Sequence, residues 1–348
     1  MKIIAIVGAR PQFIKHFPFE RACEDKIELI TIHTGQHYDE NMSDVFFNQL
    51  KMKKPNYMLN VGSGNHGVQT AKMMIEIEKI VELEKPEGMV VYGDTNSTLA
   101  GALVASKLHV PIFHIEAGLR SFNKKMPEEI NRILTDHISK AMFVPSKIAV
   151  DNLRNEGIIE NVYNVGDIMK DLVFFVKTNN LISNNGLNKN YYYVTIHRPY
   201  NTDHKERLLY VLNTLNNLNK KVIMSIHPRT SNLMSKYKID ERQFLNIEFI
   251  LPQSYFENLS LLSFSEGLIT DSGGMQKEAY WLKKRCVTIR KETEWLETLN
   301  YGANTLLFNN LKDIEQYLNA SDVVWDNNLY GNGECSIEIV SYLNSILS

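Results

Sequence analysis

The sequence predicts an α/β protein built from two Rossmann-like, doubly wound domains. Short runs of Val, Ile, Met and Phe alternate with longer segments of helical periodicity, and this alternation starts again after residue 190. The apolar runs are nearly continuous, as expected for strands of a parallel sheet that is buried on both faces. The chain has 348 residues, and at about 150 residues per domain that length favours two domains.

The first half of the chain contains six expected strands. They are residues 3–7, 29–33, 89–92, 112–115, 142–144 and 162–165. The helical segments among them are residues 13–23, 40–50, 68–84, 97–107, 128–139 and 148–156. Because strands alternate with helices, we expect one parallel sheet with right-handed crossovers, in an N-terminal domain of residues 1–176.

An Asn-rich segment at residues 177–190, KTNNLISNNGLNKN, is the predicted linker, although a long surface loop within one domain is the alternative. The alternation then resumes in a second domain, residues 191–332. Its expected strands are residues 192–196, 222–226, 247–251, 268–270, 287–289 and 305–308. A final helix at 337–347 lies in the last segment, 333–348.

Composition excludes several classes of protein. Hydrophobic residues make up 44% and charged residues 22%, which is globular and unlike a disordered, collagen or coiled-coil chain. The 38 basic and 40 acidic residues leave no positive excess for sequence-independent nucleic-acid binding. A local basic pocket for one phosphorylated small molecule remains compatible with that balance.

The cysteines and the apolar runs predict a cytoplasmic protein without membrane insertion. Cys23, Cys286 and Cys335 are far apart, which fits reduced thiols rather than a disulfide framework or a thiolate zinc site. The first apolar run stops at Val7, too early for a signal peptide. No run approaches the roughly 18 apolar residues that a spanning helix needs.

Residues able to hold an anion follow the first strand. Gly8 permits a tight turn, and Arg10 and Lys15 lie near the start of the next helix, where backbone amides attract anions. An ordinary β–α turn with solvated charges explains the same residues. The second and third glycines of a G-x-G-x-x-G fingerprint are absent, which argues against an NAD-dependent oxidoreductase.

Three acids follow expected strands or open a helix. Asp94 comes after the third strand, Glu116 after the fourth, and Glu128 follows Pro127 at a helix start. Helix capping or a favourable helix start would explain each acid alone. Because the carboxyl ends of parallel strands share one edge of a sheet, the three acids are expected to converge there, as general acid–base chemistry requires.

The second half places histidines and glycines at strand ends. His197-Arg198 and the segment from His227 to Arg229 suit phosphate contact or proton transfer, while a structural histidine is the commoner outcome for either one alone. Ser272, Gly273 and Gly274 open a helix, where a diphosphate can approach backbone amides. Glu278, about one turn later, is placed to bind ribose hydroxyls.

A metal site is not predicted. His114-x-Glu116 resembles part of a zinc deaminase signature, but the P-C-x-x-C half is missing, and no H-E-x-x-H spacing occurs.

Taken together, these motifs resemble the non-hydrolysing UDP-N-acetylglucosamine 2-epimerase family. The resemblance runs from Gly8 to about Gly302. It rests on GARPQFIK, TGQH at 34–37, GDTNST, HIEAGLR, PEEINR, the pair at His197, HPR at His227 and DSGGMQKEA. It implies a GT-B arrangement with the active site in the interdomain cleft and a last helix that returns to the first domain. It also implies a homodimer that acts on a UDP-sugar without NAD or metal.

The resemblance assigns functions to individual residues. The implied catalytic set is Arg10, Lys15, Asp94, Glu116, Glu128 and His197. The implied UDP-binding set is Arg229, Ser272, Gly273, Gly274 and Glu278. The implied reaction removes the proton at C2, expels UDP to leave a 2-acetamidoglycal, and adds UDP back after protonation of the opposite face.

The family resemblance is closest to one subgroup. GARPQFIK, HTGQHYDENMSDVFF and ETEWLET resemble enzymes acting on UDP-2,3-diacetamido-2,3-dideoxyglucuronate, whose product feeds surface polysaccharide synthesis; UDP-GlcNAc, converted to UDP-ManNAc, is the second candidate. Arg198, Lys124 and Lys125 are candidates for binding the hexuronate carboxylate, by loop position. Relatives regulated by UDP-GlcNAc carry Arg-Glu where this chain has Pro199-Tyr200, so the resemblance does not extend to that regulation.

Two further classes remain open. A GT-B glycosyltransferase would share the fold and the UDP motif but would not need three acids in its first domain. A non-catalytic nucleotide-sugar sensor would need the UDP motif and could lose those acids.

Overall fold

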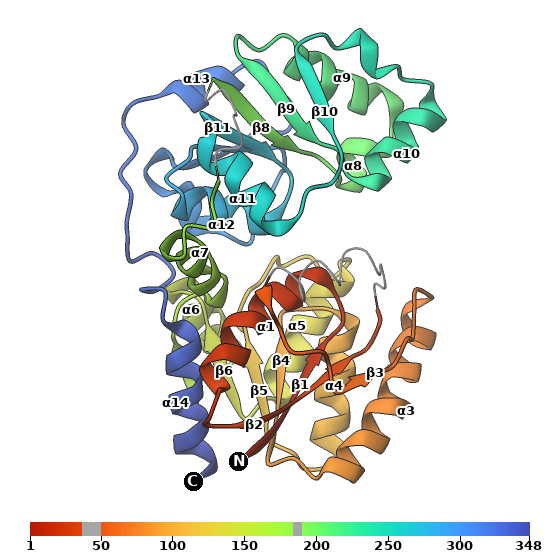
Figure 1. Ribbon diagram of the computed structural model, residues 1–348, viewed down its shortest axis with the longest axis vertical. Coiled ribbons are helices and arrows are strands. Elements are labelled where there is room, and N and C mark those ends of the chain that lie inside the picture. The colour runs from red at the N-terminus through yellow and green to blue at the C-terminus, as the bar shows by residue number, and fades with distance from the viewer. Residues whose placement is uncertain (37–49, 184–189) are drawn as a thin grey trace. The chain divides into compact units, whose positions relative to one another are not determined.

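Two compact units make up the part of the chain that the computed structural model describes, namely residues 1–36, 50–183 and 190–348. One unit combines Met1–Phe175 with Asn328–Ser348, and the other is Val176–Asn327 (Figure 1). Each unit has one parallel sheet between layers of helices. This confirms the predicted class, two Rossmann-like α/β domains. The expected helix at 40–50 lies outside the described residues except for its last position.

The described part of the first unit holds a sheet of seven parallel strands in the order β3-β2-β1-β4-β5-β6-β7. They are β1 (Lys2–Val7), β2 (Glu28–His33), β3 (Tyr57–Met58), β4 (Gly88–Tyr92), β5 (Ile112–Ile115), β6 (Ala141–Val144) and β7 (Val162–Asn164). The strand order reverses between β1 and β4, and ligands of open α/β sheets bind at such a switch point. Sequence analysis missed β3, which is two residues long and has no pattern of its own.

Helices cover both faces of this sheet. They are α1 (Arg10–Cys23), α3 (His66–Glu84), α4 (Asn96–Lys107), α5 (Pro127–Ile138), α6 (Lys147–Asn155), α7 (Ile168–Thr178) and α14 (Cys335–Leu347). The apolar sides of α3 and α4 pack on β1, β2 and β4. On the other face α1 packs against α14 (Figure 1), and Tyr342 of α14 lies 4.1 Å from Tyr163 of β7, ring centre to ring centre.

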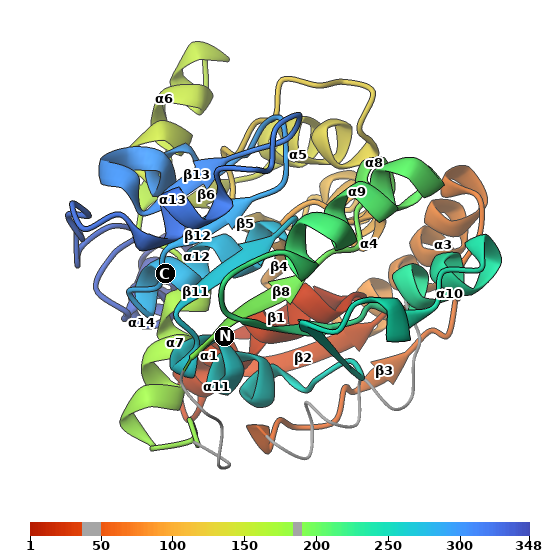
Figure 2. The same cartoon turned by 90° about the horizontal axis from the view of Figure 1, so that it is seen from above.

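The second unit repeats the plan, with six parallel strands in its described part in the order β10-β9-β8-β11-β12-β13. They are β8 (Tyr191–Thr195), β9 (Lys221–Ser225), β10 (Ile247–Ile250), β11 (Gly267–Thr270), β12 (Cys286–Thr288) and β13 (Asn304–Leu306). Helices α9 (Lys205–Asn216), α10 (Pro228–Tyr237) and α13 (Ile314–Asn319) pack on one face. Helices α11 (Tyr255–Phe264) and α12 (Gly273–Trp281) pack on the other, so α9 and α11 flank β8 (Figure 2). The short helix α8 (Pro199–Thr202) follows β8.

The unit boundaries differ by a few residues from the predicted ones. Residues 177 and 178 of the predicted linker belong to α7, whose contiguous apolar run was not singled out as a helix. Residues 328–332, assigned from sequence to the second domain, belong to the first unit. Residues 184–189 of the predicted linker lie outside the described residues.

Side chains of α7 hold the returning segment. The Asp171 carboxylate accepts the N–H groups of Cys335 (3.1 Å) and Ser336 (2.7 Å), the first residues of α14, which has no side-chain cap of its own. Burial raises the pKa of Asp171 and these hydrogen bonds lower it in part, so that the resulting pKa is about 6. The Lys170 ammonium donates to the carbonyl of Leu329 at 3.1 Å. The end of the chain is therefore tied into the first unit.

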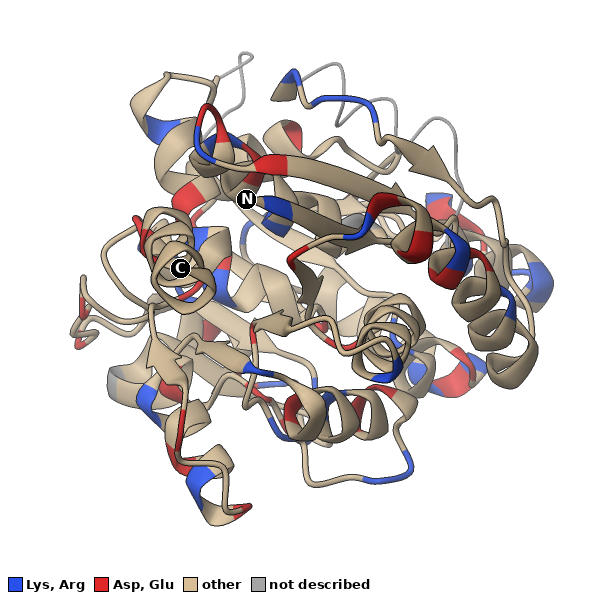
Figure 3. Cartoon of the chain, turned by 90° about the horizontal axis from the view of Figure 1, so that it is seen from below, with Lys and Arg blue, Asp and Glu red and all other residues tan. Residues whose placement is uncertain are grey.

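Acidic and basic residues are interspersed in the view from below (Figure 3), in keeping with the near-neutral total charge. Cys23, Cys286 and Cys335 are buried free thiols. Among the helices in the described part of the chain, none has the length and apolarity to span a bilayer.

Gly166→Ala should destabilise the first unit far more than Gly157→Ala. Both glycines have positive φ, +84° and +82°, so Ala costs roughly 1–2 kcal/mol of backbone strain at either site. A methyl group at Gly166 would also lie 2.5 Å from the Tyr330 carbonyl oxygen, whereas nothing lies within 4 Å at Gly157. We expect Gly166→Ala to lower the free energy of unfolding by at least about 2 kcal/mol more than its control.

The two units can be followed separately in this measurement. All three tryptophans, at 281, 295 and 325, are in the second unit. In a urea titration, Gly166→Ala should shift the far-UV circular dichroism transition and leave the tryptophan fluorescence transition in place. Equal shifts for the two variants would show that the returning segment is not packed closely at Gly166.

Candidate active site

Gln12 joins the loop after β1 to the end of β4. Its buried side-chain oxygen accepts the N–H groups of Gly8 (2.8 Å) and Ala9 (3.1 Å). Its side-chain nitrogen donates to the carbonyl of Tyr92 (2.9 Å) and to the hydroxyl of Thr98 (3.0 Å). One amide therefore fixes two strand ends at the switch point. Gln12 lies within GARPQFIK, where its residue type alone predicts no function.

The predicted residues Lys15 and Glu116 meet as an ion pair. Both side chains are at least nine-tenths buried. Gly93, at the end of β4, leaves room for them, because a methyl group there would lie 3.0 Å from the Glu116 carboxylate and 3.1 Å from the Lys15 ammonium. Arg10, the first residue of α1, has a side chain outside the described part of the structure.

Glu116 has an unusual backbone conformation. Its φ is +69°, a left-handed value that costs a non-glycine residue roughly 1–2 kcal/mol. Its amide still donates to the Phe143 carbonyl of β6 at 3.0 Å. Left-handed residues of this kind persist where surrounding contacts impose them, often at functional sites.

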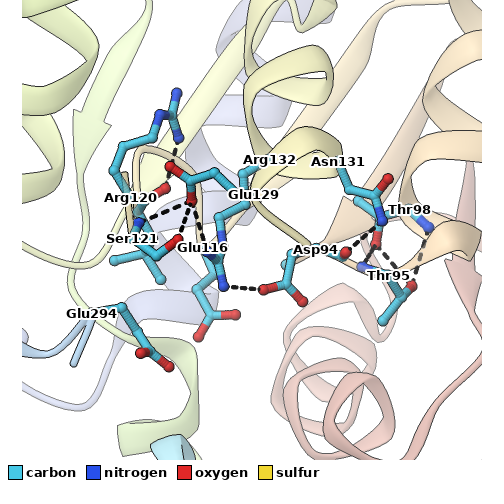
Figure 4. Close-up of polar contacts among 12 residues, drawn as sticks. Asp94, Thr95, Thr98, Glu116, Arg120, Ser121, Glu129, Asn131, Arg132 and Glu294 are labelled. Carbon is cyan, nitrogen blue, oxygen red and sulfur yellow. Dashed lines mark hydrogen bonds and ion pairs between the residues drawn. The ribbon is translucent and has the colours of Figure 1, made fainter. Parts of the chain in front are cut away.

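Asp94 is not the cap of the helix that follows it. Thr95 caps α4, and its hydroxyl accepts the Thr98 amide at 3.3 Å. Asp94 instead forms an ion pair with Arg132 of α5, which also binds Glu129 at 3.0 Å (Figure 4). Arg132 was not among the predicted site residues. The spacing of three between Glu129 and Arg132 on one helix was the available signal.

The neighbouring acids Glu128 and Glu129 have different surroundings. The buried Glu129 carboxylate accepts the amide (2.9 Å) and hydroxyl (3.0 Å) of Ser121 and the amide of Phe122 (2.9 Å). Burial would raise the pKa of Glu129, but these donors and the charge of Arg132 hold it below its usual range. Glu128 is half-buried, and its side chain has no ion pair or hydrogen bond with another described residue. Glu129 therefore supports the loop, and Glu128 is the acid available to a ligand.

The second unit contains a buried carboxylate that sequence analysis missed. Asp271, at the end of β11, accepts the amides of His197 (3.0 Å) and Arg198 (2.9 Å) and the side chain of Asn201 (3.0 Å). Burial would raise the pKa of Asp271, but its hydrogen bond with His197 and the other donors hold it below its usual range. The loop after β8 is thus fastened to the end of β11.

Asp271 also orients the His197 ring. The Nδ1 atom of His197 lies 3.1 Å from the Asp271 carboxylate, and the His197 ring stacks on that of His227 with centres 5.2 Å apart. Because Nδ1 is engaged, Nε2 is the atom that His197 can offer to a ligand.

The predicted UDP-binding residues lie in two places. Ser272, Gly273 and Gly274 form the start of α12, and Glu278 is buried one turn later. Arg229 of α10 is 43% exposed and pairs with Asp203.

An ion pair lies against the start of α12. Arg290 and Glu294 are 2.9 Å apart, and both side chains are about nine-tenths buried. A methyl group at Gly273 would be 2.6 Å from the Glu294 carboxylate, so an alanine there would force that side chain to shift. Charged groups of both signs therefore adjoin the backbone amides predicted to bind diphosphate.

The structure therefore brings Lys15, Glu116 and Asp94 together at the carboxyl edge of the first sheet, with Glu128 on the adjoining α5. Among the described residues, no group of three or more His, Cys, Asp and Glu side chains could hold a metal ion.

Asp271→Asn should destabilise the second unit at neutral pH by about 2–3 kcal/mol, because an amide nitrogen would then face N–H donors in a buried site. The lowered pKa of Asp271 predicts how this stabilisation changes with pH. Its stabilisation is present above the ordinary Asp pKa near 4 and is lost as pH falls through the lower pKa of the folded state. The difference between variant and wild type should therefore narrow in acid.

Asp203→Asn is the matched control, because its ion pair with Arg229 is exposed and worth only about 0–1 kcal/mol. Urea unfolding followed by tryptophan fluorescence measures both variants. Equal midpoints for the two would contradict the structural importance of Asp271.

The chain is similar to known proteins over almost its whole length. A family model described as UDP-N-acetylglucosamine 2-epimerase matches residues 21–344. A UDP-N-acetylglucosamine 2-epimerase homolog of Methanococcus maripaludis is 46% identical, with 99% of this chain and 100% of the relative covered. The UDP-2,3-diacetamido-2,3-dideoxy-D-glucuronate 2-epimerase of Pseudomonas aeruginosa is 45% identical, with 99% of each covered.

A solved structure shows the same fold. The UDP-GlcNAc 2-epimerase of Methanocaldococcus jannaschii, in complex with UDP-GlcNAc and UDP, superposes with a TM-score of 0.91 at 43% identity. The match covers 99% of this chain and 100% of that one. It confirms the predicted fold class, two Rossmann-like domains of the GT-B type.

Proposed function

The chain belongs to the UDP-N-acetylglucosamine 2-epimerase family and is a nucleotide-sugar 2-epimerase of the non-hydrolysing type, and we propose that its substrate is UDP-2,3-diacetamido-2,3-dideoxy-glucuronate. The full-length similarity to the Pseudomonas aeruginosa enzyme supports this substrate. UDP-GlcNAc is the second candidate, because relatives of 44% identity are UDP-N-acetylglucosamine 2-epimerases. The product would enter surface polysaccharide synthesis.

The proposed reaction is an elimination followed by a re-addition. A carboxylate removes the C2 proton, the C1–O bond breaks, and its electron pair leaves with UDP, so that a C1=C2 double bond forms. A second acid protonates C2 from the opposite face, and the UDP oxygen attacks C1 again. The observation that carries this proposal is the convergence of Glu116, Lys15 and Asp94 at the switch point of the first sheet.

Each residue of the catalytic set has a proposed part in these steps. Asp94, Glu116 and Glu128 would exchange the C2 proton, since carboxylates can act as general base and general acid. Arg10 and Lys15 would compensate the charge that develops on the diphosphate. His197 would contact the same leaving group through Nε2.

The proposed UDP site uses the second unit. The amides of Ser272, Gly273 and Gly274 at the start of α12 would hold the diphosphate, because helix N-termini attract anions. Glu278 would accept hydrogen bonds from the ribose, and Arg229 would contribute positive charge.

Arg198 is the favoured partner for the hexuronate carboxylate. Its Nε is buried and finds no acceptor among the described residues, so a donor is vacant. Lys124 and Lys125, the other candidates, are exposed. A buried donor without an acceptor is costly, so this site favours a sugar that carries an acceptor such as a carboxylate there.

We also propose a homodimer. Large apolar side chains are exposed on α3 and α5, which lie on one side of the first unit. They are Val68 (55% exposed), Ile75 (54%), Leu83 (70%), Ile130 (38%) and Leu134 (44%). A second copy of the chain would cover them.

Asp94→Asn, Glu116→Gln and Glu128→Gln should each reduce turnover by roughly 10²-fold or more, because each removes a charge at the reacting centre and little volume. Glu129→Gln is the adjacent control. It should mainly lower the thermal midpoint, since its carboxylate supports the loop at Ser121 and Phe122. Turnover close to wild type in two of the three acid variants would overturn the assignment.

Proton NMR of the reaction in D₂O tests substrate and mechanism together. Each UDP-sugar is incubated with enzyme, and the C2 epimer is followed over time. We expect deuterium at C2 of the product, because the proton that is lost exchanges with solvent. Full retention of the C2 hydrogen would exclude the glycal route.

The same spectra compare the two sugars. We expect a higher kcat/KM for the diacetamido-glucuronate, because a sugar without a carboxylate leaves the site's cation unpaired. If UDP-GlcNAc reacts equally well or better, the substrate is UDP-GlcNAc and the proposed specificity fails.

A further inference from the structure

His114 is a buried residue between two of the proposed catalytic acids. It lies on β5, two residues before Glu116, and its side chain has no solvent exposure. The ring Nδ1 is 2.6 Å from the Asp136 carboxylate of α5, and the ring Nε2 is 2.8 Å from the carbonyl oxygen of Gly93. Both ring nitrogens are therefore within hydrogen-bond distance of an oxygen.

Neither of these oxygens supplies a proton. The Gly93 carbonyl can only accept. Asp136 also accepts from the Arg120 guanidinium at 2.8 Å and from the Gly118 amide at 3.2 Å. The Arg120 guanidinium and the Gly118 amide both stabilise the charged form of Asp136, so its carboxylate accepts a hydrogen bond from His114 and does not donate one.

We infer that His114 is an imidazolium at neutral pH and acts as a positioning residue for Asp94 and Glu116. A neutral ring has one N–H, so one nitrogen lone pair would face an oxygen lone pair at 2.6 or 2.8 Å. With both nitrogens protonated, each contact is a hydrogen bond.

The surrounding charges balance a buried cation. Asp136 lies between His114 and Arg120. Arg120 in turn forms two 2.7 Å hydrogen bonds with Glu156, whose side chain is 26% exposed. Positive and negative side chains therefore alternate from His114 through Asp136 and Arg120 to Glu156, and their four charges sum to zero. The neighbour of His114 on β6 is Met142, which is apolar.

The ring fixes the loop that carries Asp94. The Gly93 amide donates to the Ile115 carbonyl of β5 at 3.0 Å, and the Gly93 carbonyl accepts from His114. The amide and the carbonyl of Gly93, the residue before Asp94, are thus both hydrogen-bonded to β5.

The ring also acts on the loop that carries Glu116. It orients Asp136, whose other oxygen holds the amide of Gly118, two residues beyond Glu116. That contact lies within the turn where Glu116 has its left-handed φ of +69°. One ring therefore connects β4, β5 and α5 around the two acids.

This inference rests on the proposed functions of Asp94 and Glu116, but the protonation state can be tested without them. Wild-type protein labelled with ¹⁵N-histidine is examined by long-range ¹H–¹⁵N NMR, and the His114 signals are identified by their loss in His114→Asn. We expect both ring nitrogens to carry a proton at neutral pH, because each one faces a hydrogen-bond acceptor. A single protonated nitrogen at neutral pH would overturn the inference.

Kinetics test the positioning function on a wild-type enzyme shown to epimerise. His114→Asn keeps a short donor toward Asp136, and His114→Gln keeps a longer donor toward Gly93, yet neither carries charge. Both should lower kcat about 10–100-fold with KM changed less than about 3-fold, because the acids are displaced while UDP binding is not. Loss of the buried cation should also move the acidic limb of the kcat profile to higher pH, which loss of packing alone would not do.

His109→Asn is the matched control, because His109 is exposed and has a φ of +56° that Asn tolerates. It should keep wild-type kcat and pH profile. If the folded His114 variants behave like this control, the positioning function is wrong. If the wild-type enzyme epimerises neither sugar, the proposed function fails while the NMR result on His114 still stands.

Discussion

Buried carboxylates, each surrounded by N–H donors, hold the loops at the carboxyl ends of both sheets. Asp136 in the first unit and Asp271 in the second are almost without solvent exposure. Each accepts amide or side-chain donors from loops that strand pairing alone would not restrain. Burying a carboxylate costs little free energy only when such donors remain in place. The loop conformation therefore stabilises the charge, and the charge stabilises the loop conformation. Each carboxylate also binds a histidine, His114 or His197.

The acids proposed to react with substrate are placed differently from these supporting ones. The Glu129 carboxylate accepts hydrogen bonds from the loop at Ser121 and Phe122, whereas the carboxylate of Glu128, one residue earlier, accepts none from that loop. Successive residues on a helix point about 100° apart, so one faces the loop and its neighbour does not. The Asp94 side chain is 31% exposed, and Arg132 is its one ion-pair partner among the described residues. These acids combine fixed positions with access to a ligand.

Much of the fold could be predicted from the sequence, because buried parallel strands are continuous apolar runs and their ends share an edge of the sheet. The same reasoning predicted that Asp94, Glu116 and Glu128 meet at one edge of the first sheet. It missed Asp271, whose place before a helix also fits a helix cap, and Arg132, whose spacing of three from Glu129 also fits an ordinary surface ion pair.

Other differences arose from lengths and contacts that a linear pattern does not record. Strand β3 has only two residues, and its pairing with β2 depends on the sheet that is already there. Helix α7 reads as a buried apolar run, which periodicity cannot distinguish from a strand. Glu116 has a left-handed φ because neighbouring strands impose it, and its residue type would not predict that conformation.

The return of the last helix to the first unit has a consequence for synthesis on the ribosome. The second unit is one continuous stretch, Val176–Asn327, whereas the first is completed only by Asn328–Ser348. After the first sheet emerges, roughly 150 further residues must be made, which takes about 8–30 s at 5–20 residues per second. During that interval Tyr163 lacks its aromatic partner in α14, and Asp171 lacks the amides that it later binds. The nascent protein therefore carries an uncovered apolar strip that a chaperone could bind until the final helix arrives.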